Sequence, residues 1–339
     1  MRDIRELQYM QSLPLEQKII MTQQRIQGWY EYFAGNCYIS FSGGKDSTVL
    51  LNLARDLYPN IEAVFVDTGL EYSQIRGFVN TFDNITILRP KMRFDEVIKK
   101  YGYPIISKEV AQTIYITRKN PNSKTAQKYD IDSEYCKKYG SRFCQKKWIP
   151  LKNEQTIPIS HMCCKIMKKD PAQRYSIQTG KMPITAQMAE ESELRKSNWL
   201  AHGCNMFDLK YPKSNPMSFW TEQDVLRYIY ENDIKICSVY GNVVCDDAQL
   251  NFDGEWVTKY HTTGCSRTGC VFCGFGAHLP EKPPRFLMLK QIDYKKYNYC
   301  FSGGEFVEGV WQPNEKGLGM QYVYETLNEI YGNDFVKYK

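Results

Sequence analysis

The sequence has no run of apolar residues long enough to cross a bilayer, which takes roughly 20 residues. Its first segment, MRDIRELQYMQSLP, carries charges where a secretory signal has its apolar stretch, so we expect a cytoplasmic protein. There is no internal repeat and no low-complexity tract, and 42% hydrophobic with 24% charged residues is an ordinary globular composition. These absences exclude a membrane-spanning or disordered chain, and 339 residues provide for one large domain or two.

A disulfide framework and a strong charge imbalance are also missing. The twelve cysteines are unevenly spaced in a long chain, so we expect reduced or metal-bound thiols. The net charge of +6 is too small by itself to indicate a polyanionic partner. Residues 118–152, however, hold ten Lys or Arg and three acidic residues, a net +7. This basic segment is either a solvated surface or a nucleic-acid contact.

Strand and helix patterns alternate along the first part of the chain. The connections between them are short, which predicts right-handed crossovers and an α/β fold, a parallel twisted sheet with helices on both faces. The predicted strands are 37–42, 62–67, 85–88 and 181–186, and the predicted helices are 14–33, 46–59, 72–83 and 221–231.

We expect three parts along the chain. Residues 1–35 form a helical segment, and residues 36–235 form the α/β domain. Residues 117–158 break the alternation and are predicted to be a partly helical basic insertion. Residues 236–339 are expected to be a loop-rich, cysteine-containing C-terminal region.

The segment SGGKDS follows the first predicted strand and opens the next predicted helix. In an open α/β sheet, ligands bind beyond the carboxyl ends of strands, where helix N-termini favour anions. The glycine pair lets a phosphate approach the backbone, the lysine adds positive charge, and the serines add hydroxyl donors. An aspartate follows the lysine, so this is not the common G-x-x-x-x-G-K-[ST] loop. The candidate phosphate-binding residues are Ser42, Gly43, Gly44, Lys45, Asp46 and Ser47.

SGGKDS closely resembles the PP-loop of ATP pyrophosphatases, the adenine nucleotide alpha-hydrolase group, which cleave ATP between its α and β phosphates. The resemblance implies ATP with Mg²⁺, and catalytic roles for Lys45 and Asp46. In that group a second strand ends in an acidic residue near the nucleotide, and VDTGLE at 66–71 matches this pattern. Asp67, followed by Thr68 and Gly69, is therefore expected near the adenosine or a magnesium ion. A helix cap is the alternative role of the aspartate.

Five cysteines have the spacing of a metal site. HMCCKIMKKDP contains two adjacent thiols, and GCSRTGCVFCGFG contains three as C-x4-C-x2-C. A C-x2-C pair binds a metal from a single turn and needs further ligands, which the adjacent pair can supply. Four thiolates suit zinc or an iron-sulfur cluster alike. The five candidates for four positions are Cys163, Cys164, Cys265, Cys270 and Cys273. The isolated cysteines are expected to be small buried hydrophobes: Cys37, Cys204, Cys237, Cys245 and Cys300.

The CC pair, the distant C-x2-C and NPMSFWTEQDVLRYI (215–229) together resemble the sulfonucleotide reductase family, which reduces adenylylsulfate or 3'-phosphoadenylylsulfate (PAPS). PITAQMAEESELR (183–195) is similar to that family's I-T-G-x-R-x-x-E-S-x-x-R, with Ala186 and Met188 as departures. The resemblance covers residues 36 to about 275. It implies a [4Fe-4S] cluster on the cysteines, with Zn²⁺ as the alternative, and nucleotide contacts from Thr185, Glu191, Ser192 and Arg195.

The chain departs from that family at its end. The family's nucleophile is a cysteine near the C-terminus, but here no cysteine follows Cys300 and the last residues are YGNDFVKYK. The loop nevertheless keeps Lys45 and Asp46, which ATP cleavage would use. These two departures favour ATP-dependent activation over simple reduction of adenylylsulfate.

Our hypothesis is a PP-loop ATP pyrophosphatase that adenylates an acceptor and supports sulfur transfer with an iron-sulfur cluster and a sulfur donor protein. Similar PP-loop proteins thiolate transfer RNA or supply sulfur to DNA, and the basic segment 118–152 would suit such a nucleic acid. One alternative is a sulfonucleotide reductase that uses another thiol. Another is a nucleotide-binding regulator that senses redox state through the cluster without catalysis. No membrane partner is expected.

Overall fold

The computed structural model describes residues 2–140, 144–250, 256–280 and 283–339. The chain forms two compact units. Unit 1 comprises Met1–Asp67, Glu71–Arg89 and Pro171–Thr268, and unit 2 comprises Thr68–Leu70, Pro90–Asp170 and Gly269–Lys339. Because packing in space defines these units, they do not test the domain boundaries predicted along the chain, which stay predictions.

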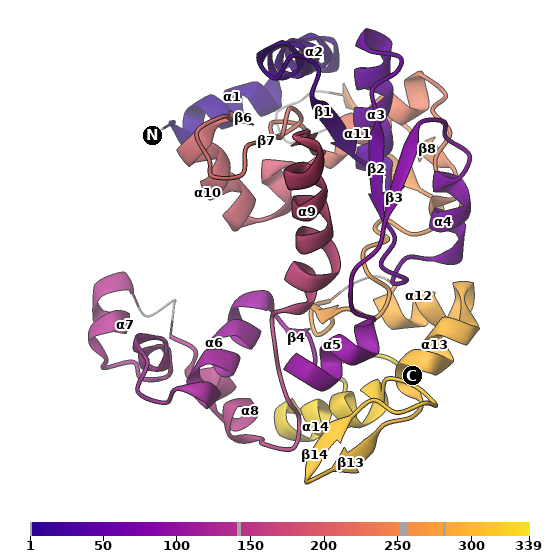
Figure 1. Cartoon of the computed structure of the whole chain (residues 1–339). Helices are drawn as coiled ribbons and strands as arrows, with labels where there is room; N and C mark the ends of the chain where they lie inside the picture. The colour runs from indigo at the N-terminus through magenta and orange to yellow at the C-terminus, as the bar shows by residue number, and fades with distance from the viewer. Residues whose placement is uncertain (1, 141–143, 251–255, 281–282) are drawn as a thin grey trace. The chain divides into compact units, whose positions relative to one another are not determined.

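Unit 1 is built on a six-stranded sheet of order β3-β2-β1-β5-β7-β6. All neighbouring strands pair in parallel except β6 and β7, which are antiparallel. Figure 1 shows α9 on one side of the first three strands and α3 and α4 on the other. The predicted fold class, a mostly parallel sheet flanked by helices, is therefore confirmed. The strands are β1 (Cys37–Ser40), β2 (Ala63–Val66), β3 (Ile85–Leu88), β5 (Met182–Ile184), β6 (Asn205–Met206) and β7 (Lys213–Ser214).

The helices of unit 1 begin and end close to the sequence signals. The predicted helix 46–59 is observed as α3, which ends before Pro59, and the predicted helix 72–83 ends four residues early at Val79. The helices are α1 (Ile4–Ser12), α2 (Leu15–Tyr32), α3 (Lys45–Leu57), α4 (Ser73–Val79), α9 (Asp170–Thr179), α10 (Glu193–His202) and α11 (Glu222–Glu231), with 3-10 turns η5 (Ala189–Glu191) and η6 (Ser238–Tyr240). Short antiparallel pairs join β8 (Val243–Cys245) to β11 (Tyr260–Thr262) and β9 (Gln249–Leu250) to β10 (Trp256–Val257).

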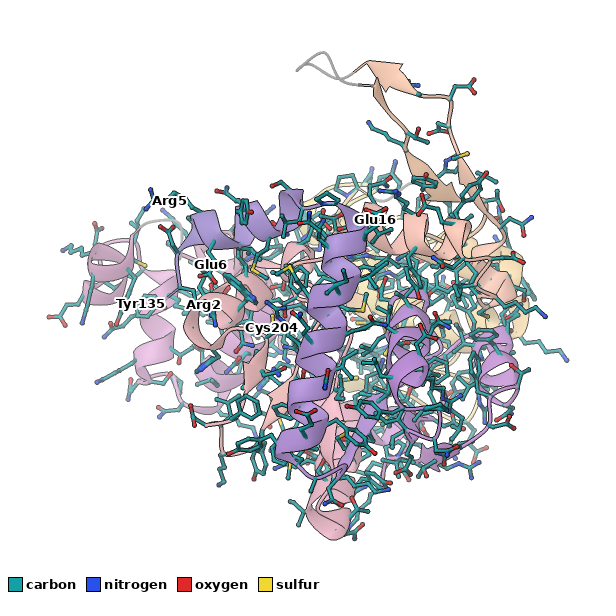
Figure 2. The ribbon with its side chains drawn as sticks, turned by 90° about the horizontal axis from the view of Figure 1, so that it is seen from above. Arg2, Arg5, Glu6, Glu16, Tyr135 and Cys204 are labelled. Atoms are coloured by element: carbon teal, nitrogen blue, oxygen red, sulfur yellow. The ribbon has the colours of Figure 1, made fainter. Side chains whose placement is uncertain are left out.

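The N-terminal helices belong to unit 1. The guanidinium of Arg2 lies over the ring of Trp199 in α10, 5.5 Å from its centroid, and Arg2 pairs with Glu6. Figure 2 shows Arg2, Arg5 and Glu6 along α1 and Glu16 at the start of α2. These contacts attach the predicted N-terminal segment to the sheet unit.

A buried ion pair fixes α2 against α11. Lys18, whose side chain is 2% exposed, lies 2.7 Å from Asp224, and the same carboxylate accepts the backbone N–H of Thr221 at the N-cap of α11. The W-T-E-Q-D stretch therefore has a structural role as a capping box besides any role in binding.

Replacing Asp224 by alanine is expected to destabilise the fold by about 3–5 kcal/mol, because it leaves the Lys18 charge buried and unpaired. Glu231→Ala is the matched control on the same helix, since its pair with Arg227 is exposed and worth less than about 1 kcal/mol. Urea unfolding of both variants measures the difference. If both substitutions lowered the free energy of unfolding equally, the buried Lys18–Asp224 pair would contribute no more stability than the exposed Arg227–Glu231 pair.

Unit 2 contains the basic insertion and most of the C-terminal region. Strands β4 (Ile105–Ile106) and β12 (Gly274–Phe275) pair in parallel, and β13 (Glu305–Val307) and β14 (Val310–Gln312) form an antiparallel hairpin. The helices are α5 (Phe94–Tyr101), α6 (Lys108–Lys119), η1 (Lys124–Tyr129), α7 (Glu134–Tyr139), η3 (Lys146–Trp148), α8 (Ile149–Asn153), the π-helix η4 (Lys165–Lys169), α12 (Arg285–Ile292), α13 (Tyr294–Phe301) and α14 (Met320–Tyr331).

The structure of unit 2 agrees with one expectation from the sequence and differs in part from another. The insertion 117–158 is partly helical as predicted, although its residues 141–143 lie outside the described chain. The expected loop-rich character fits residues 236–280, where short strands and turns prevail, but it is wrong for residues 285–331, which carry three helices. Within the described ranges, no helix has both the length and the apolar character needed to span a membrane.

Candidate functional site

The SGGKDS segment joins β1 to α3 in unit 1. Gly43 has φ +69°, and a Cβ atom there would come within 2.8 Å of Val79 on α4, so only glycine fits. The hydroxyls of Ser42 and Ser47 lie 3.0 Å apart, and Ser47 donates to the carbonyl of Gly44. The two serines thus fix the turn, and the backbone amides at the start of α3 lie at the carboxyl end of the central strand, where an anion is favoured.

Lys45 is buried in the first turn of α3, with its side chain 4% exposed. Its ammonium lies 3.1 Å from the carboxylate of Glu222 and donates to the carbonyl of Ser266 at 3.2 Å. Its backbone N–H donates to the hydroxyl of Tyr240, which also bonds to Thr268 at 2.9 Å. A buried ammonium requires such partners. Because Glu222 is 42% exposed, an incoming phosphate can replace this carboxylate as the partner of the lysine.

Asp46 and the segment 183–195 contribute to the same cluster. Burial lowers the pKa of Arg195, nearby Arg267 lowers it further, and the carboxylate of Asp46 opposes both effects. These interactions bring two guanidinium groups and Asp46 into one electrostatic environment. Arg195 and Arg267 both pair with Glu191, the latter at 3.8 Å. The cluster therefore combines three cations with carboxylates that can release them to a ligand.

The remaining predicted residues of 183–195 have local roles. Thr185 donates to the side chain of Asn215, and its backbone N–H bonds to Ser214 on the adjacent strand. Ser192 is the N-cap of α10 and accepts the N–H of Arg195. These contacts hold the segment at the end of β5. In the sheet, β5 and β2 are the two neighbours of β1.

Asp67 follows β2, which neighbours β1 in the sheet. Its carboxylate is 8% exposed, lies 2.7 Å from Arg76 on α4 and lies 3.9 Å from Arg89 after β3. Thr68 and Gly69 belong to unit 2, where the hydroxyl of Thr68 accepts the N–H of Leu70. Asp67 and the SGGKDS segment thus occupy the carboxyl ends of adjacent strands of unit 1. Thr68 and Gly69, the two candidates that follow Asp67, belong to unit 2 instead.

Four of the five candidate cysteines belong to unit 2. Cys163 and Cys164 begin a helical turn that continues into the π-helix η4, and Cys273 donates its N–H to the carbonyl of Cys270. Burial raises the pKa of the Cys163 thiol, and Cys270, Cys164 and Cys273 raise it further. Burial likewise raises the pKa of Cys273 to about 12, with smaller contributions from Cys270 and Cys164. Mutual interactions of this kind require the four thiols to lie near one another.

The turn that holds Cys270 and Cys273 is anchored on both sides. Arg285 donates to the carbonyls of Cys273 and Phe275 at 2.9 and 3.0 Å. A Cβ atom at Gly274 would come within 2.8 Å of the Pro104 carbonyl, so glycine is required next to the second cysteine. The sequence of this turn thereby fixes where its two thiols lie.

Four thiolates are the donor set that zinc or an iron-sulfur cluster takes, and within unit 2 these four cysteines influence one another's pKa. Among the described residues, however, no set of three or more His, Cys, Asp or Glu side chains is gathered closely enough to hold a metal ion. For Mg²⁺ the fitting atom is Asp46 Oδ1, which is enclosed and accepts no hydrogen bond within the described structure, although it lies 3.5 Å from the ammonium of Lys45.

Cys265 belongs to unit 1, where its N–H bonds to the carbonyl of Val239 and its carbonyl accepts from Thr262. Of the isolated cysteines, four are buried as expected and Cys245 is exposed, so the expectation was wrong for that residue: the buried ones are Cys37, Cys204, Cys237 and Cys300.

Sequence reasoning assigned no role to several residues around Lys45. Glu222 lies within the quoted W-T-E-Q-D stretch, and Arg267 lies within the C-x4-C segment. Tyr240 and Ser266 had no recognisable signal, because they reach the loop only through folding. The position of Arg267, three residues before the C-x2-C pair, was the available clue.

A mostly parallel α/β sheet with a glycine-rich loop at the end of its central strand defines a nucleotide-binding protein of the adenine nucleotide alpha-hydrolase fold. The sequence profile of the phosphoadenosine phosphosulfate reductase domain matches residues 36–274. The chain belongs to this family.

Two kinds of relative align with the chain. A protein of Methanocaldococcus jannaschii recorded as uncharacterised is 24% identical over 318 residues, which cover 89% of this chain and 58% of that protein. This chain thus spans less than two thirds of that relative's length. Adenosine 5'-phosphosulfate reductases of Bacillus cereus and Bacillus anthracis are each 22% identical over 250 residues, covering 69% of this chain and 84% and 87% of those enzymes.

Proposed function

We propose that this chain is an enzyme that binds ATP at Ser42–Ser47 and cleaves it between the α and β phosphates to adenylate an acceptor. The observation that carries the proposal is the buried ammonium of Lys45 at the N-terminus of α3, next to Arg195 and Arg267. Three cations and a helix N-terminus stabilise negative charge that develops on departing pyrophosphate.

In the proposed reaction an acceptor oxygen attacks the α phosphorus, and the bond from that phosphorus to the bridging oxygen breaks. Pyrophosphate leaves with the bonding electrons, and the acceptor's proton passes to solvent. Lys45 holds the β and γ phosphates, while Arg195 and Arg267 neutralise the remaining charge. Asp46 Oδ1 would hold Mg²⁺, and Asp67 would face the adenosine or the ion. A reduced sulfur nucleophile from a donor protein then displaces AMP from the acceptor.

The proposal assigns Cys163, Cys164, Cys270 and Cys273 to an iron-sulfur cluster, with Zn²⁺ as the alternative. When bound, a cluster supplies a site for holding sulfur or passing electrons. The electrostatic interactions among these four thiols in unit 2 support this assignment. The cytoplasmic location expected from the sequence is part of the same proposal.

The proposed acceptor is a nucleic acid, either transfer RNA or DNA, which contacts the basic segment 118–152. Of the basic side chains that the structure describes there, Lys128 is in an ion pair, and six lysines are exposed: Lys119, Lys124, Lys137, Lys138, Lys146 and Lys147. Lys119, Lys138 and Lys147 lie over the rings of Tyr115, Tyr139 and Trp148 at 4.4–5.4 Å. Lysines interleaved with aromatic rings suit phosphates and exposed bases.

A second candidate function is reduction of a sulfonucleotide, which the alignment with adenosine 5'-phosphosulfate reductases over 69% of the chain favours. Incubation of anaerobically purified protein with labelled ATP and Mg²⁺ separates the two. Under the first proposal pyrophosphate is released, and transfer RNA or DNA increases the rate. Tight binding of adenylylsulfate with no ATP turnover in any mixture would overturn the first proposal and favour the second.

A further inference from the structure

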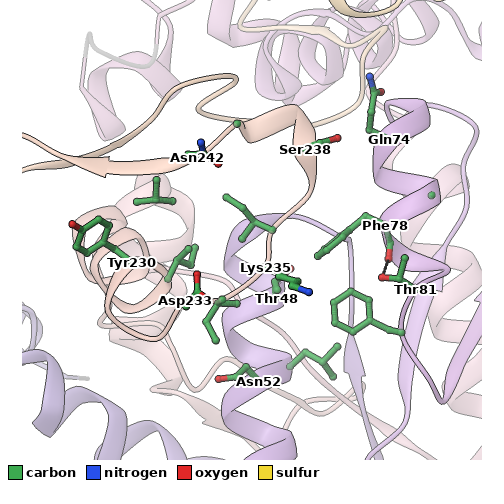
Figure 3. Close-up of a pocket in the computed structure, with 18 of the residues that line it drawn as sticks. Thr48, Asn52, Gln74, Phe78, Thr81, Tyr230, Asp233, Lys235, Ser238 and Asn242 are labelled. Carbon is green, nitrogen blue, oxygen red and sulfur yellow. Dashed lines mark hydrogen bonds between the residues drawn. The ribbon is translucent and has the colours of Figure 1, made fainter.

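Unit 1 has a large, partly open cavity outside the phosphate loop. Its volume is about 1300 Å³, and it is lined by α3, α4 and the chain from Ile229 to Val243 (Figure 3). None of the residues 42–47 lines it. A volume of this order exceeds the roughly 300–1,000 Å³ of common ligand sites. The cavity therefore has room for an organic ligand that is separate from the nucleotide in the phosphate loop.

Aromatic rings form two sides of the cavity. Figure 3 shows Phe78 on α4 and Tyr230 on α11 at opposite sides of the space. The ring of Phe78 meets that of Phe82 edge-on at 4.9 Å, and Phe82 is itself packed against buried Phe41 at 5.0 Å. Rings anchored in this way present flat apolar surface, which a planar aromatic group covers well.

The charged lining residues are two cations and one anion. Lys235 lines the cavity as an exposed residue, near Thr48 in Figure 3, and forms no ion pair in the described part of the chain. Arg55 donates to the carbonyl of Asp83 at 2.6 Å, but its Nε is enclosed and has no hydrogen-bond partner among the described residues. The acidic residue, Asp233, lies at the exposed edge. The side chains of Lys235 and Arg55 can therefore donate hydrogen bonds to an anionic group.

Two amide side chains supply further polar contacts. Asn52 accepts a hydrogen bond from Tyr228 at 2.6 Å through Oδ1, which orients its NH₂ group as a donor. Gln74 Oε1 is enclosed and, within the described structure, has no donor. A buried polar atom without a partner is costly, so a ligand that bonds to Gln74 Oε1 and Arg55 Nε would stabilise both.

We propose that this cavity binds an organic anion with a planar aromatic ring system, the ring lying between Phe78 and Tyr230 and the anionic group facing Lys235 and Arg55. A metal ion does not fit this lining, because it offers one carboxylate among mostly apolar and cationic groups. The proposal does not depend on ATP cleavage, since it concerns different residues.

Gly77 provides a steric test of the site. It lies on α4, lines the cavity, and a Cβ atom built there meets nothing within 4 Å. Gly77→Leu is therefore tolerated at its Cβ, is expected to reduce the cavity space, and replaces glycine by a better helix former. Gly77→Ala is the small matched control. Gly28→Leu is the distant control, since Gly28 is also an exposed helical glycine with open space around it.

The probe is 1-anilinonaphthalene-8-sulfonate, an aromatic anion whose fluorescence rises in apolar sites, titrated into the full-length protein. The wild type, Gly77→Ala and Gly28→Leu are expected to bind one equivalent, and Gly77→Leu to bind at least about tenfold more weakly. Cooperative urea unfolding of each variant verifies that the probe reports a folded protein. Unchanged binding by Gly77→Leu, or displacement of the probe by saturating ATP, overturns the proposal.

The charge requirement is tested with a neutral analogue, N-phenyl-1-naphthylamine. Lys235→Gln is expected to weaken the sulfonate probe about tenfold, the usual loss for a charged hydrogen bond, and to leave the neutral probe unchanged. Lys210→Gln, at an exposed lysine of unit 1 that does not line the cavity, is the control. If Lys235→Gln affects both probes equally, or neither, the assignment of an anionic ligand is wrong.

Discussion

Lys45→Ala is expected to reduce ATP-dependent release of pyrophosphate by about 10²- to 10³-fold, the usual cost of removing one preorganised charge donor from a reaction centre. The ammonium of Lys45 is already desolvated, and its partner Glu222 is partly exposed, so a phosphate can take the place of the carboxylate. The substitution therefore removes charge stabilisation at the departing pyrophosphate. Release of labelled pyrophosphate under single-turnover conditions measures this effect.

The matched control is Lys196→Ala, at a half-buried lysine of α10 paired with exposed Glu193. It is expected to leave the rate within about twofold, because an exposed ion pair contributes little. Urea unfolding of Lys45→Ala establishes that the loop variant is folded. If this folded variant kept the wild-type rate, the phosphate loop would not be the reaction centre. If the wild type releases no pyrophosphate, the same pair of variants is compared for adenylylsulfate binding.

Replacement of any one of Cys163, Cys164, Cys270 and Cys273 by serine is expected to abolish binding of the metal group. A four-thiolate centre has no spare ligand, so three thiolates would not hold the group. The measurement is iron, acid-labile sulfide and zinc content of protein purified without oxygen. Equal iron and sulfide identify a cluster, whereas zinc without sulfide identifies a zinc site.

Two further cysteine variants sharpen this test. Cys245→Ser is the control, because this thiol is exposed and lies in unit 1. Cys265→Ser decides between the five candidates, since this residue is assigned to unit 1 and the other four to unit 2. Loss of metal in Cys265→Ser together with retention in Cys164→Ser would overturn the assignment of the adjacent pair.

Local signals were sufficient to predict the framework of unit 1. The glycine pair, the apolar strand before it and Pro59 after the helix identify β1, the loop and α3 from a continuous stretch of sequence. The N-cap Thr221 located α11 in the same way. In contrast, α12 and α13 were missed, because apolar, aromatic and basic residues alternate around them without a clear apolar face.

The environment of Lys45 could not be predicted for a different reason. The lysine and Ser266 are 221 residues apart in the chain, and the ion-pair partner Glu222 is 177 residues away. No periodicity or local motif encodes such a contact, since it depends on how β5, β7 and α11 follow β1 in space. Only the folded structure shows that the Lys45 ammonium is buried. The argument that a phosphate can replace the carboxylate of Glu222 depends on that burial.

Helix α3 is shared by two parts of the molecule described above. Its first turn carries Lys45, and the residues Thr48, Asn52 and Arg55 on one of its faces form the floor of the large cavity. Thr48 also donates to the carbonyl of Gly44. The loop and the cavity are therefore both built on this one helix. Any coupling between their ligands would be equal in both directions, by thermodynamic linkage.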